Sequence, residues 1–219
     1  GQCGFVAPPR DAASEARRKR MGGAFGGSAT MAVGALRAWK EALRPGEEQC
    51  FPLEVSGADG LVDCVVQARP SPEVFRCTVD MPLPLCVESV ERYYEERSYD
   101  VTDVYLPGIT HMVLPVEQMP SRAFAEAALR EWSTHFSTDA CGLLLYDWAQ
   151  QRMEPLVYVR STNTLIWERG CGTVSAAMGV YLAYQNRAEA TEAIRQPGGE
   201  IVVSAAWSDG VEKLTITGD

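Results

Sequence analysis

The sequence is poor in the residues and spacings that mark metal sites, disulfide frameworks and exported proteins. It has two histidines in 219 residues, and none of its seven cysteines forms a CxxC pair or stands at metal-ligand spacing from a histidine. An odd number of cysteines without paired spacing argues against a disulfide framework, and the missing ligand spacing argues against a zinc site. The N-terminal GQCGFVAPPR lacks the charged and apolar regions of a signal peptide. We therefore expect a protein of the reducing cytoplasm that holds no metal.

Basic runs and long apolar runs are also scarce. The formal net charge is -9, and the one sustained basic run is RRKR, residues 17–20. Nucleic acid and anionic membranes attract basic surfaces, so neither is an expected partner. No apolar run approaches the length needed to span a bilayer. Because Glu15 and the sequence MGG bracket the basic run, we interpret residues 11–20 as a short charged helix with a solvated face.

One local pattern occurs twice in the chain. GGAFGGSATMAVGALRAW, residues 22–39, can be laid without a gap on ERGCGTVSAAMGVYLAY, residues 168–184. The alignment pairs Gly26 with Cys171, Gly27 with Gly172 and Ser28 with Thr173. Each copy combines a Gly-rich entry with small and apolar residues on most sides, which is typical of a buried helix, and Ser28 is a candidate cap of the first helix.

Strand-like segments surround both predicted helices. Alternation predicts strands within residues 49–79, with a hairpin turn at SGADG, and further strands in VTDVYLPGITHMVLPV, ACGLLLYDW, EPLVYVR and NTLIWE. SRAFAEAALREWSTHF is interpreted as an amphipathic helix capped by Ser121, AEATEAIR as an extension or sequel of the second buried helix, and the C-terminus as a hairpin turned at SDG. These elements predict an α+β chain in two halves, residues 1–73 and 74–219, of which the first is short at its N-terminus.

A cysteine at the entry of a buried helix has a chemical use. The free N–H groups of the first turn and the positive end of the helix dipole stabilise an anion, so we expect the Cys171 thiolate to act as a base or nucleophile. The same N–H groups can hold a substrate carboxylate, which glycine allows to approach closely. Two such entries predict two half-sites that face each other across the interface between the halves. Two thiols placed in this way would remove a proton from one face of a carbon and deliver one to the other.

These motifs resemble those of the diaminopimelate epimerase superfamily, especially its amino-acid racemase branch, which includes histidine racemase. GGAFGGSATM is similar to the first-half pattern Gly-Gly-Glu-Phe-Cys-Gly-Asn-Ala-Thr, and WERGCGTVSAA is similar to the second-half pattern Trp-Glu-Ser-Gly-Cys-Gly-Ser-Gly-Thr. LPGITHMVLP resembles the Gly-x-x-His segment that opens the second half. The resemblance covers nearly the whole chain. It implies two pseudo-symmetric halves, each a curved sheet around a central helix, and an isomerase whose two-base mechanism needs neither pyridoxal phosphate nor a metal.

Residue by residue, the resemblance implies a catalytic base and a set of substrate-binding positions for an amino acid. The base is Cys171, and the substrate-binding residues are Gly26, Gly27, Ser28, His111, Glu168, Gly172 and Thr173. The departures from the family pattern lie in the first half-site, where Gly26 replaces the first catalytic cysteine, Ala24 a glutamate and Ser28 an asparagine. Glycine has no side-chain proton to give or take, so the standard two-thiol mechanism is not available to this chain.

Four interpretations follow. The chain is an amino-acid racemase or epimerase whose second base is Cys3, His111 or a water; a one-base lyase or isomerase; a binding protein that kept the cleft and lost the chemistry; or a sequence in which Gly26 and the short N-terminus are not natural. We favour an origin among these racemases with altered or impaired activity, and an active isomerase ahead of each of the other interpretations. Two of the named positions have a purely structural alternative. His111 can be a packed histidine, and Glu168 can form an ion pair with Arg169. A homodimer is compatible with such folds.

Overall fold

The computed structural model describes residues 4–20 and 25–219, so Cys3 and Ala24 lie outside the described residues. Within these ranges the helices are α1 (Gly27–Lys40), α2 (Arg122–Trp132) and α3 (Gly172–Asn186), with two short 3-10 turns, η1 (Val116–Gln118) and η2 (Ser133–His135). The strands are β1 (Gly4–Ala7), β2 (Ala16–Arg20), β3 (Glu48–Val55), β4 (Leu61–Ala68), β5 (Phe75–Asp80), β6 (Cys86–Tyr94), β7 (Arg97–Leu106), β8 (Ile109–Pro115), β9 (Ala140–Asp147), β10 (Arg152–Val159), β11 (Thr164–Trp167), β12 (Ala190–Gln196), β13 (Gly199–Trp207) and β14 (Val211–Gly218).

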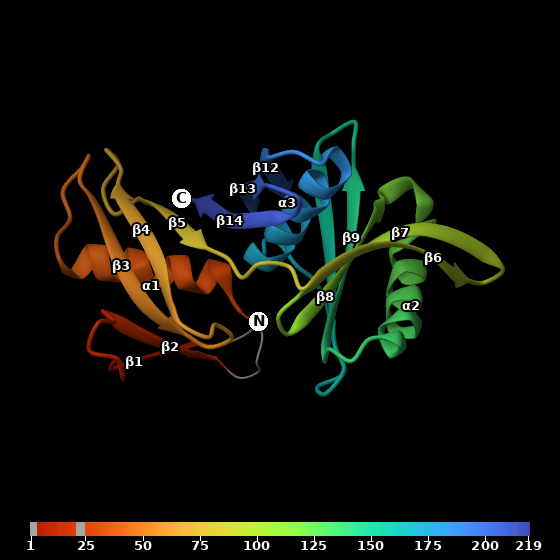
Figure 1. The fold of residues 1–219 in the computed structure, drawn as a ribbon, viewed down its shortest axis with the longest axis horizontal. Coiled ribbons are helices and arrows are strands. Elements are labelled where there is room, and N and C mark those ends of the chain that lie inside the picture. Colours follow the sequence, from red (N-terminus) through yellow and green to blue (C-terminus); the bar gives the residue numbers. More distant parts are fainter. Residues whose placement is uncertain (1–3, 21–24) are drawn as a thin grey trace.

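The strands form two curved layers, and each layer lies against its own central helix (Figure 1). Along the hydrogen-bonded sheet the order is β1-β2-β3-β4-β5-β14-β13-β12-β10-β9-β8-β7-β6, with β11 paired to β10. Helix α1 packs on β3, β4 and β5, and α3 packs on β12, β13 and β14. The sheet-dominated α+β prediction is therefore confirmed.

The same topology occurs in both halves. An antiparallel hairpin, β1–β2 or β9–β10, is followed by the central helix and then by a strand that runs parallel to the second strand of the hairpin. Two antiparallel strands complete each set, β4–β5 in one and β13–β14 in the other. The sets meet where β5 pairs antiparallel with β14, and the Oγ1 atoms of Thr78 and Thr217 lie 2.8 Å apart across this ladder. The repeat seen in the sequence is thus a repeat of the fold.

The division of the chain at residues 73 and 74 stays a prediction. Strand β5 begins just after it, at Phe75, and pairs with β4 on one side and with β14 on the other. A further unit of β6, β7, β8 and α2 packs beside β9 and forms a second core around the buried Trp132. As expected, Ser121 caps α2, and its Oγ accepts a hydrogen bond from the N–H of Phe124 at 3.1 Å.

Two predicted helices are wrong. The end of the segment 11–20 forms β2 instead, between β1 and β3, and the strand alternation turns Arg18 inward, where it is 2 % exposed. AEATEAIR does not continue α3, because the helix ends at Asn186 and its C-cap residue Arg187 takes the left-handed conformation with φ 48°. This segment forms most of β12, whose Ile194 side chain is fully buried. In both places pairing with neighbouring strands outweighs local helix propensity.

Within residues 4–20 and 25–219 no helix is both long and apolar enough to cross a bilayer. In the same ranges no three or more His, Cys, Asp and Glu side chains are grouped so that they could hold a metal ion.

Candidate active site at two facing helix N-termini

The N-termini of α1 and α3 meet at the centre of the molecule. The N–H of Gly172 donates a hydrogen bond to the Oγ of Ser28 at 3.0 Å. A Cβ atom added at Gly172 would lie 2.9 Å from the backbone N of Ser28 and 3.1 Å from the Cα of Gly27, so only glycine permits this approach. Because the first N–H groups of an α-helix have no partner within the helix, two such termini at one point form a site for an anion.

The two helix entries are built alike. In α1 the carbonyl of Gly26 accepts hydrogen bonds from the N–H and the Oγ1 of Thr30, both at 3.0 Å. In α3 the carbonyl of Cys171 accepts from the N–H and the Oγ of Ser175, both at 3.1 Å. Ser28, expected as the cap of α1, lies instead in its first turn, and Gly26 is the N-cap.

Cys171 is the N-cap residue of α3 and is half-buried, in extended backbone conformation. Its Sγ lies 3.2 Å from the Oγ1 of Thr173, so a hydroxyl contacts the sulfur. The first turn of α3 carries no acidic residue, and Thr173 is 6 % exposed. A thiolate at Cys171 would lie at the positive end of the helix dipole, and the first turn of α3 places no carboxylate beside it.

The segment that carries the thiol is held from outside the helix. The N–H of Glu168, which is half-buried, donates to the carbonyl of Pro155 at 2.9 Å, and the carbonyl of Arg169 accepts from Gly198 at 2.5 Å. The N–H of Cys171 donates to the Oε1 of Gln196 at 3.0 Å. Sequence reasoning missed Gln196, since it placed the preceding residues on a helix and no motif marks a glutamine 25 positions after the cysteine.

The first half-site holds an arginine where the resemblance implies a base. The Nη1 of Arg18 donates to the carbonyl of Gly26 at 2.6 Å. A Cβ atom at Gly26 would lie 2.4 Å from this nitrogen, so the guanidinium fills the space that a side chain at position 26 would need. A guanidinium keeps its protons at neutral pH and cannot serve as a base. Arg18 was also missed, because the basic run was interpreted as a solvated helix face.

The contact described for His111 is with a neighbouring strand and not with the helix entries. It is fully buried on β8, where its ring covers Gly142 of β9, and a Cβ atom at Gly142 would lie 2.2 Å from the Nδ1 of His111. Burial lowers the pKa of His111 to about 3, so the ring is neutral near pH 7. Among the described residues neither ring nitrogen finds a hydrogen-bond partner. The geometry favours a packed, neutral histidine at this position.

The buried His111 predicts a loss of stability in acid. The unfolded chain takes up a proton as the pH falls below about 6.5, whereas the folded chain does so only near pH 3. The free energy of unfolding should therefore fall by about 1.4 kcal/mol per pH unit across this window on account of His111 alone. Urea denaturation at pH 7.5, 6 and 5 should show this fall in the wild type and a weaker one in His111→Phe. His135→Phe, which changes the exposed histidine, is the control and should keep the wild-type slope; equal slopes in all three proteins would contradict the prediction.

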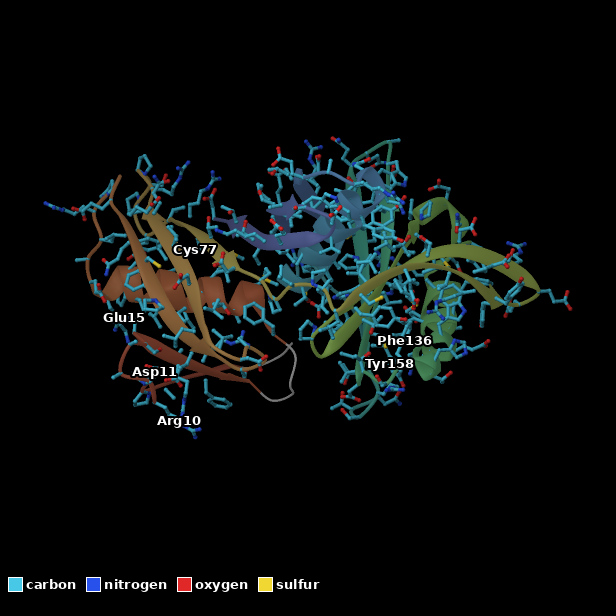
Figure 2. The ribbon with its side chains drawn as sticks, in the orientation of Figure 1. Arg10, Asp11, Glu15, Cys77, Phe136 and Tyr158 are labelled. Carbon is cyan, nitrogen blue, oxygen red and sulfur yellow. The ribbon has the colours of Figure 1, made fainter. Side chains whose placement is uncertain are left out.

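A hollow of about 410 Å³ opens beside the facing helix entries. Ser28, Gly170 and Gln196 line it next to the site, and Met31, Phe75 and Cys77 are among the apolar residues of its wall. Figure 2 labels Cys77 on β5, in the half that contains α1. The acidic residues Glu200 and Asp219 also line the hollow. Its size and mixed lining suit a small polar molecule with an apolar part.

Comparison with known proteins identifies the family. The whole chain, residues 1–219, matches the family described as histidine racemase CntK N-terminal domain. The histidine racemase of Staphylococcus aureus is 30% identical over an alignment of 210 residues that covers 93% of this chain and 73% of that protein. A histidine racemase of Fusobacterium nucleatum is 23% identical over 200 residues, 90% of this chain and 71% of that protein.

Solved structures of similar fold include an epimerase and a probable racemase. A hydroxyproline epimerase from Agrobacterium vitis, with bound trans-4-hydroxy-L-proline, has a TM-score of 0.72 and 18% identity, covering 100% of this chain and 71% of that one. A probable proline racemase from Agrobacterium radiobacter, with bound carbonate, has a TM-score of 0.73 and 17% identity, covering 100% of this chain and 73% of that one. The family match, the curated relatives and the shared fold agree with the motifs at the two helix entries. The chain belongs to the histidine racemase family, within the superfamily of isomerases that racemise or epimerise amino acids without pyridoxal phosphate.

Proposed function

We propose that the chain is a cofactor-independent amino-acid racemase or epimerase in which Cys171 takes or returns the α-proton of its substrate. The observation that carries this proposal is the meeting of two helix N-termini beside the thiol of Cys171, with the N–H of Gly172 3.0 Å from the Oγ of Ser28. The substrate carboxylate binds at this meeting point, where its oxygen takes the place of the Ser28 hydroxyl on the Gly172 N–H. The α-carbon then lies over the Cys171 sulfur.

The proton transfer follows from this placement. The Cys171 thiolate takes the α-proton and becomes a thiol, and the electron pair of the broken C–H bond moves into the carboxylate, which becomes a dianionic enediolate. Charge thus develops on the carboxylate oxygens, where the N–H groups and dipoles of both helices are fixed in advance. Return of a proton to the same carbon completes the reaction, and its direction of arrival decides whether the configuration is inverted.

A one-base reaction is the second candidate, and the position of Arg18 favours it. Its Nη1 lies within 2.4 Å of where the Cβ of residue 26 would be, so a cation stands in place of the first thiol. In that case Cys171 removes and returns the proton on one face, or a leaving group departs from the β-carbon after deprotonation. Inversion would instead require a second proton donor on the side of Gly26, such as a water or Cys3, which lies outside the described residues.

The substrate is proposed to be a small amino acid that extends into the hollow next to the site. Relatives at 30% and 23% identity bear the name histidine racemase, which puts histidine first. Glu200 and Asp219 are compatible with an imidazole side chain, although Asp219 is also paired with Arg76 at 2.9 Å and Glu200 with Arg195 at 3.7 Å. An amino-acid ligand and a homodimer both stay predictions.

Heavy-water exchange tests the proposal directly. The protein is incubated in D₂O with L-histidine, L-proline, trans-4-hydroxy-L-proline and L-alanine, loss of the α-proton signal is followed by NMR, and the products are separated by chirality. Exchange with inversion for at least one amino acid supports the racemase, whereas exchange with retention or an alkene product supports the one-base candidate. Absence of exchange for the whole panel, under conditions where the protein is folded, would contradict both.

A further inference from the structure

We propose that Gln196 is a positioning residue for the Cys171 thiol. From the end of β12 it fixes the peptide group of Cys171, and with it the direction in which the sulfur projects. This inference rests on the proposed function, because it assigns Gln196 a role toward the proton-transferring group. It concerns a residue that lies 25 positions from the cysteine and outside the helix-entry motif.

A closed ring of hydrogen bonds connects the two residues. The Oε1 of Gln196 accepts from the N–H of Cys171 at 3.0 Å, and the Nε2 of Gln196 donates to the Oγ of Ser175 at 2.7 Å. The Oγ of Ser175 in turn donates to the carbonyl of Cys171 at 3.1 Å. One side-chain amide therefore controls the N–H of Cys171 directly and its carbonyl through one hydroxyl.

The ring is shielded from water. Gln196 is 6 % exposed and Ser175 is fully buried. Loss of one member would leave buried polar groups without partners, which costs more than the net gain from an ordinary surface hydrogen bond. The amide of Gln196 is thus held in one orientation, with its oxygen toward Cys171 and its nitrogen toward Ser175.

The helix itself supplies this restraint only at the carbonyl of Cys171, which accepts a hydrogen bond from the N–H of Ser175 at 3.1 Å. An N-cap residue is only half inside the helix, and its N–H is not part of the helical hydrogen-bond pattern. The preceding Arg169 and Gly170 are exposed and belong to no helix or strand. Apart from Gln196, the turn between β12 and β13 holds this segment through the Gly198 N–H on the Arg169 carbonyl at 2.5 Å. The orientation of the Cys171 peptide therefore depends on the Gln196 amide.

The first half-site differs at this point. Thr30 binds the carbonyl of Gly26 as Ser175 binds that of Cys171, but the side chain that completes the set is Arg18. The ring of hydrogen bonds that Gln196 completes is thus found at the half-site that carries the Cys171 thiol. Gln196 also lines the hollow together with Ser28 and Gly170, so a molecule bound there would contact the side chain that orients the sulfur.

Three variants test the inference. Gln196→Met keeps the length of the side chain and removes both hydrogen bonds, and Gln196→Glu keeps an oxygen for the Cys171 N–H. Gln185→Met, at the opposite end of α3, is the matched control. Because small displacements of a reacting group are costly, we expect Gln196→Met to lower kcat for α-proton exchange by about 10- to 100-fold with KM within about threefold of the wild type. Gln196→Glu should recover at least a third of the wild-type kcat, and the control should match the wild type.

A second readout does not depend on turnover. The rate at which iodoacetamide alkylates Cys171, measured by peptide mass spectrometry, should fall at least about threefold in Gln196→Met, because the sulfur leaves its alignment with the helix N-terminus. The exposed Cys50 and Cys86 serve as internal references and should react as before. Wild-type kcat and an unchanged alkylation rate in Gln196→Met, or equal loss in Gln196→Glu, would overturn the inference.

The two readouts also separate this inference from the proposed function. If the wild type shows no Cys171-dependent exchange but Gln196→Met still slows alkylation of Cys171, the proposed function fails and the positioning of the thiol by Gln196 stands. If exchange depends on Cys171 but neither kcat nor alkylation responds to Gln196→Met, the proposed function stands and the role of Gln196 fails.

Discussion

The Cys171→Ser variant is expected to lose α-proton exchange by about 10²- to 10⁴-fold, the range that a positioned general acid or base contributes. A serine hydroxyl is a much weaker acid than a thiol, so its oxygen is scarcely ionised near neutral pH. Serine is also a preferred N-cap residue, which makes unfolding of α3 an improbable cause of the loss. The rate is measured by NMR in D₂O with the amino acid that the wild type exchanges fastest, together with the thermal midpoint of each protein.

Other cysteines supply the controls. Cys86→Ser changes an exposed thiol and should keep the wild-type exchange rate. In the wild type, iodoacetamide should modify Cys171 faster than Cys64, because a hydrogen bond with Cys77 and burial raise the pKa of the Cys64 thiol. Exchange that survives in Cys171→Ser, or alkylation of Cys171 no faster than that of Cys64, would contradict a reactive thiolate at the entry of α3.

The second large effect is expected at the first half-site. Adding a thiol through Gly26→Cys should raise the ratio of inversion to retention by about 10²-fold when Arg18 is shortened to alanine in the same protein, because a second general acid then faces Cys171. Gly26→Cys alone should give a much smaller rise. Its Cβ would lie 2.4 Å from the Nη1 of Arg18, so the guanidinium must first be displaced from the carbonyl of Gly26.

Two further proteins make this experiment specific. Arg18→Ala alone removes the cation without adding a thiol and should not increase inversion. Gly26→Cys combined with Arg17→Ala removes a neighbouring arginine while Arg18 stays in place, and should behave like Gly26→Cys. Chiral chromatography of the products after partial exchange gives the ratio. Equal ratios in Gly26→Cys and in its combination with Arg18→Ala would show that Arg18 does not obstruct the first half-site.

The helices and most strands could be predicted from local sequence. Small and apolar residues on nearly all sides marked α3 as buried, whereas α1, with a similar pattern, is buried on one face only and leaves Ala32 and Trp39 exposed. Alternation marked β3 and β4, and a short apolar run marked the buried β8. The repeat also predicted that Gly27 and Gly172 occupy equivalent places, and the structure brings both helix entries together. The roles of these residues toward a substrate stay predictions.

Features that depend on contacts distant in sequence could not be predicted. Alanine and glutamate favour helices in isolation, yet Ala190–Gln196 pairs with β13 and forms a strand. A basic run suggests solvent, yet the position of β2 between two strands turns Arg18 inward. Gln196 reaches Cys171 only because β12 ends beside the entry of α3. Such contacts are a property of the folded sheet and leave no local signal in the sequence.

The ladder between β5 and β14 has a consequence for how the two half-sites can differ. Two identical subunits can associate as a dimer by pairing their edge strands antiparallel across a two-fold axis. Here both partners belong to one polypeptide, and Thr78 faces Thr217 across the ladder. In a dimer of identical subunits any substitution changes both half-sites at once. In a single chain one copy can carry a glycine, as at Gly26, while the other carries a thiol, as at Cys171, so one side can be specialised for holding a substrate and the other for proton transfer.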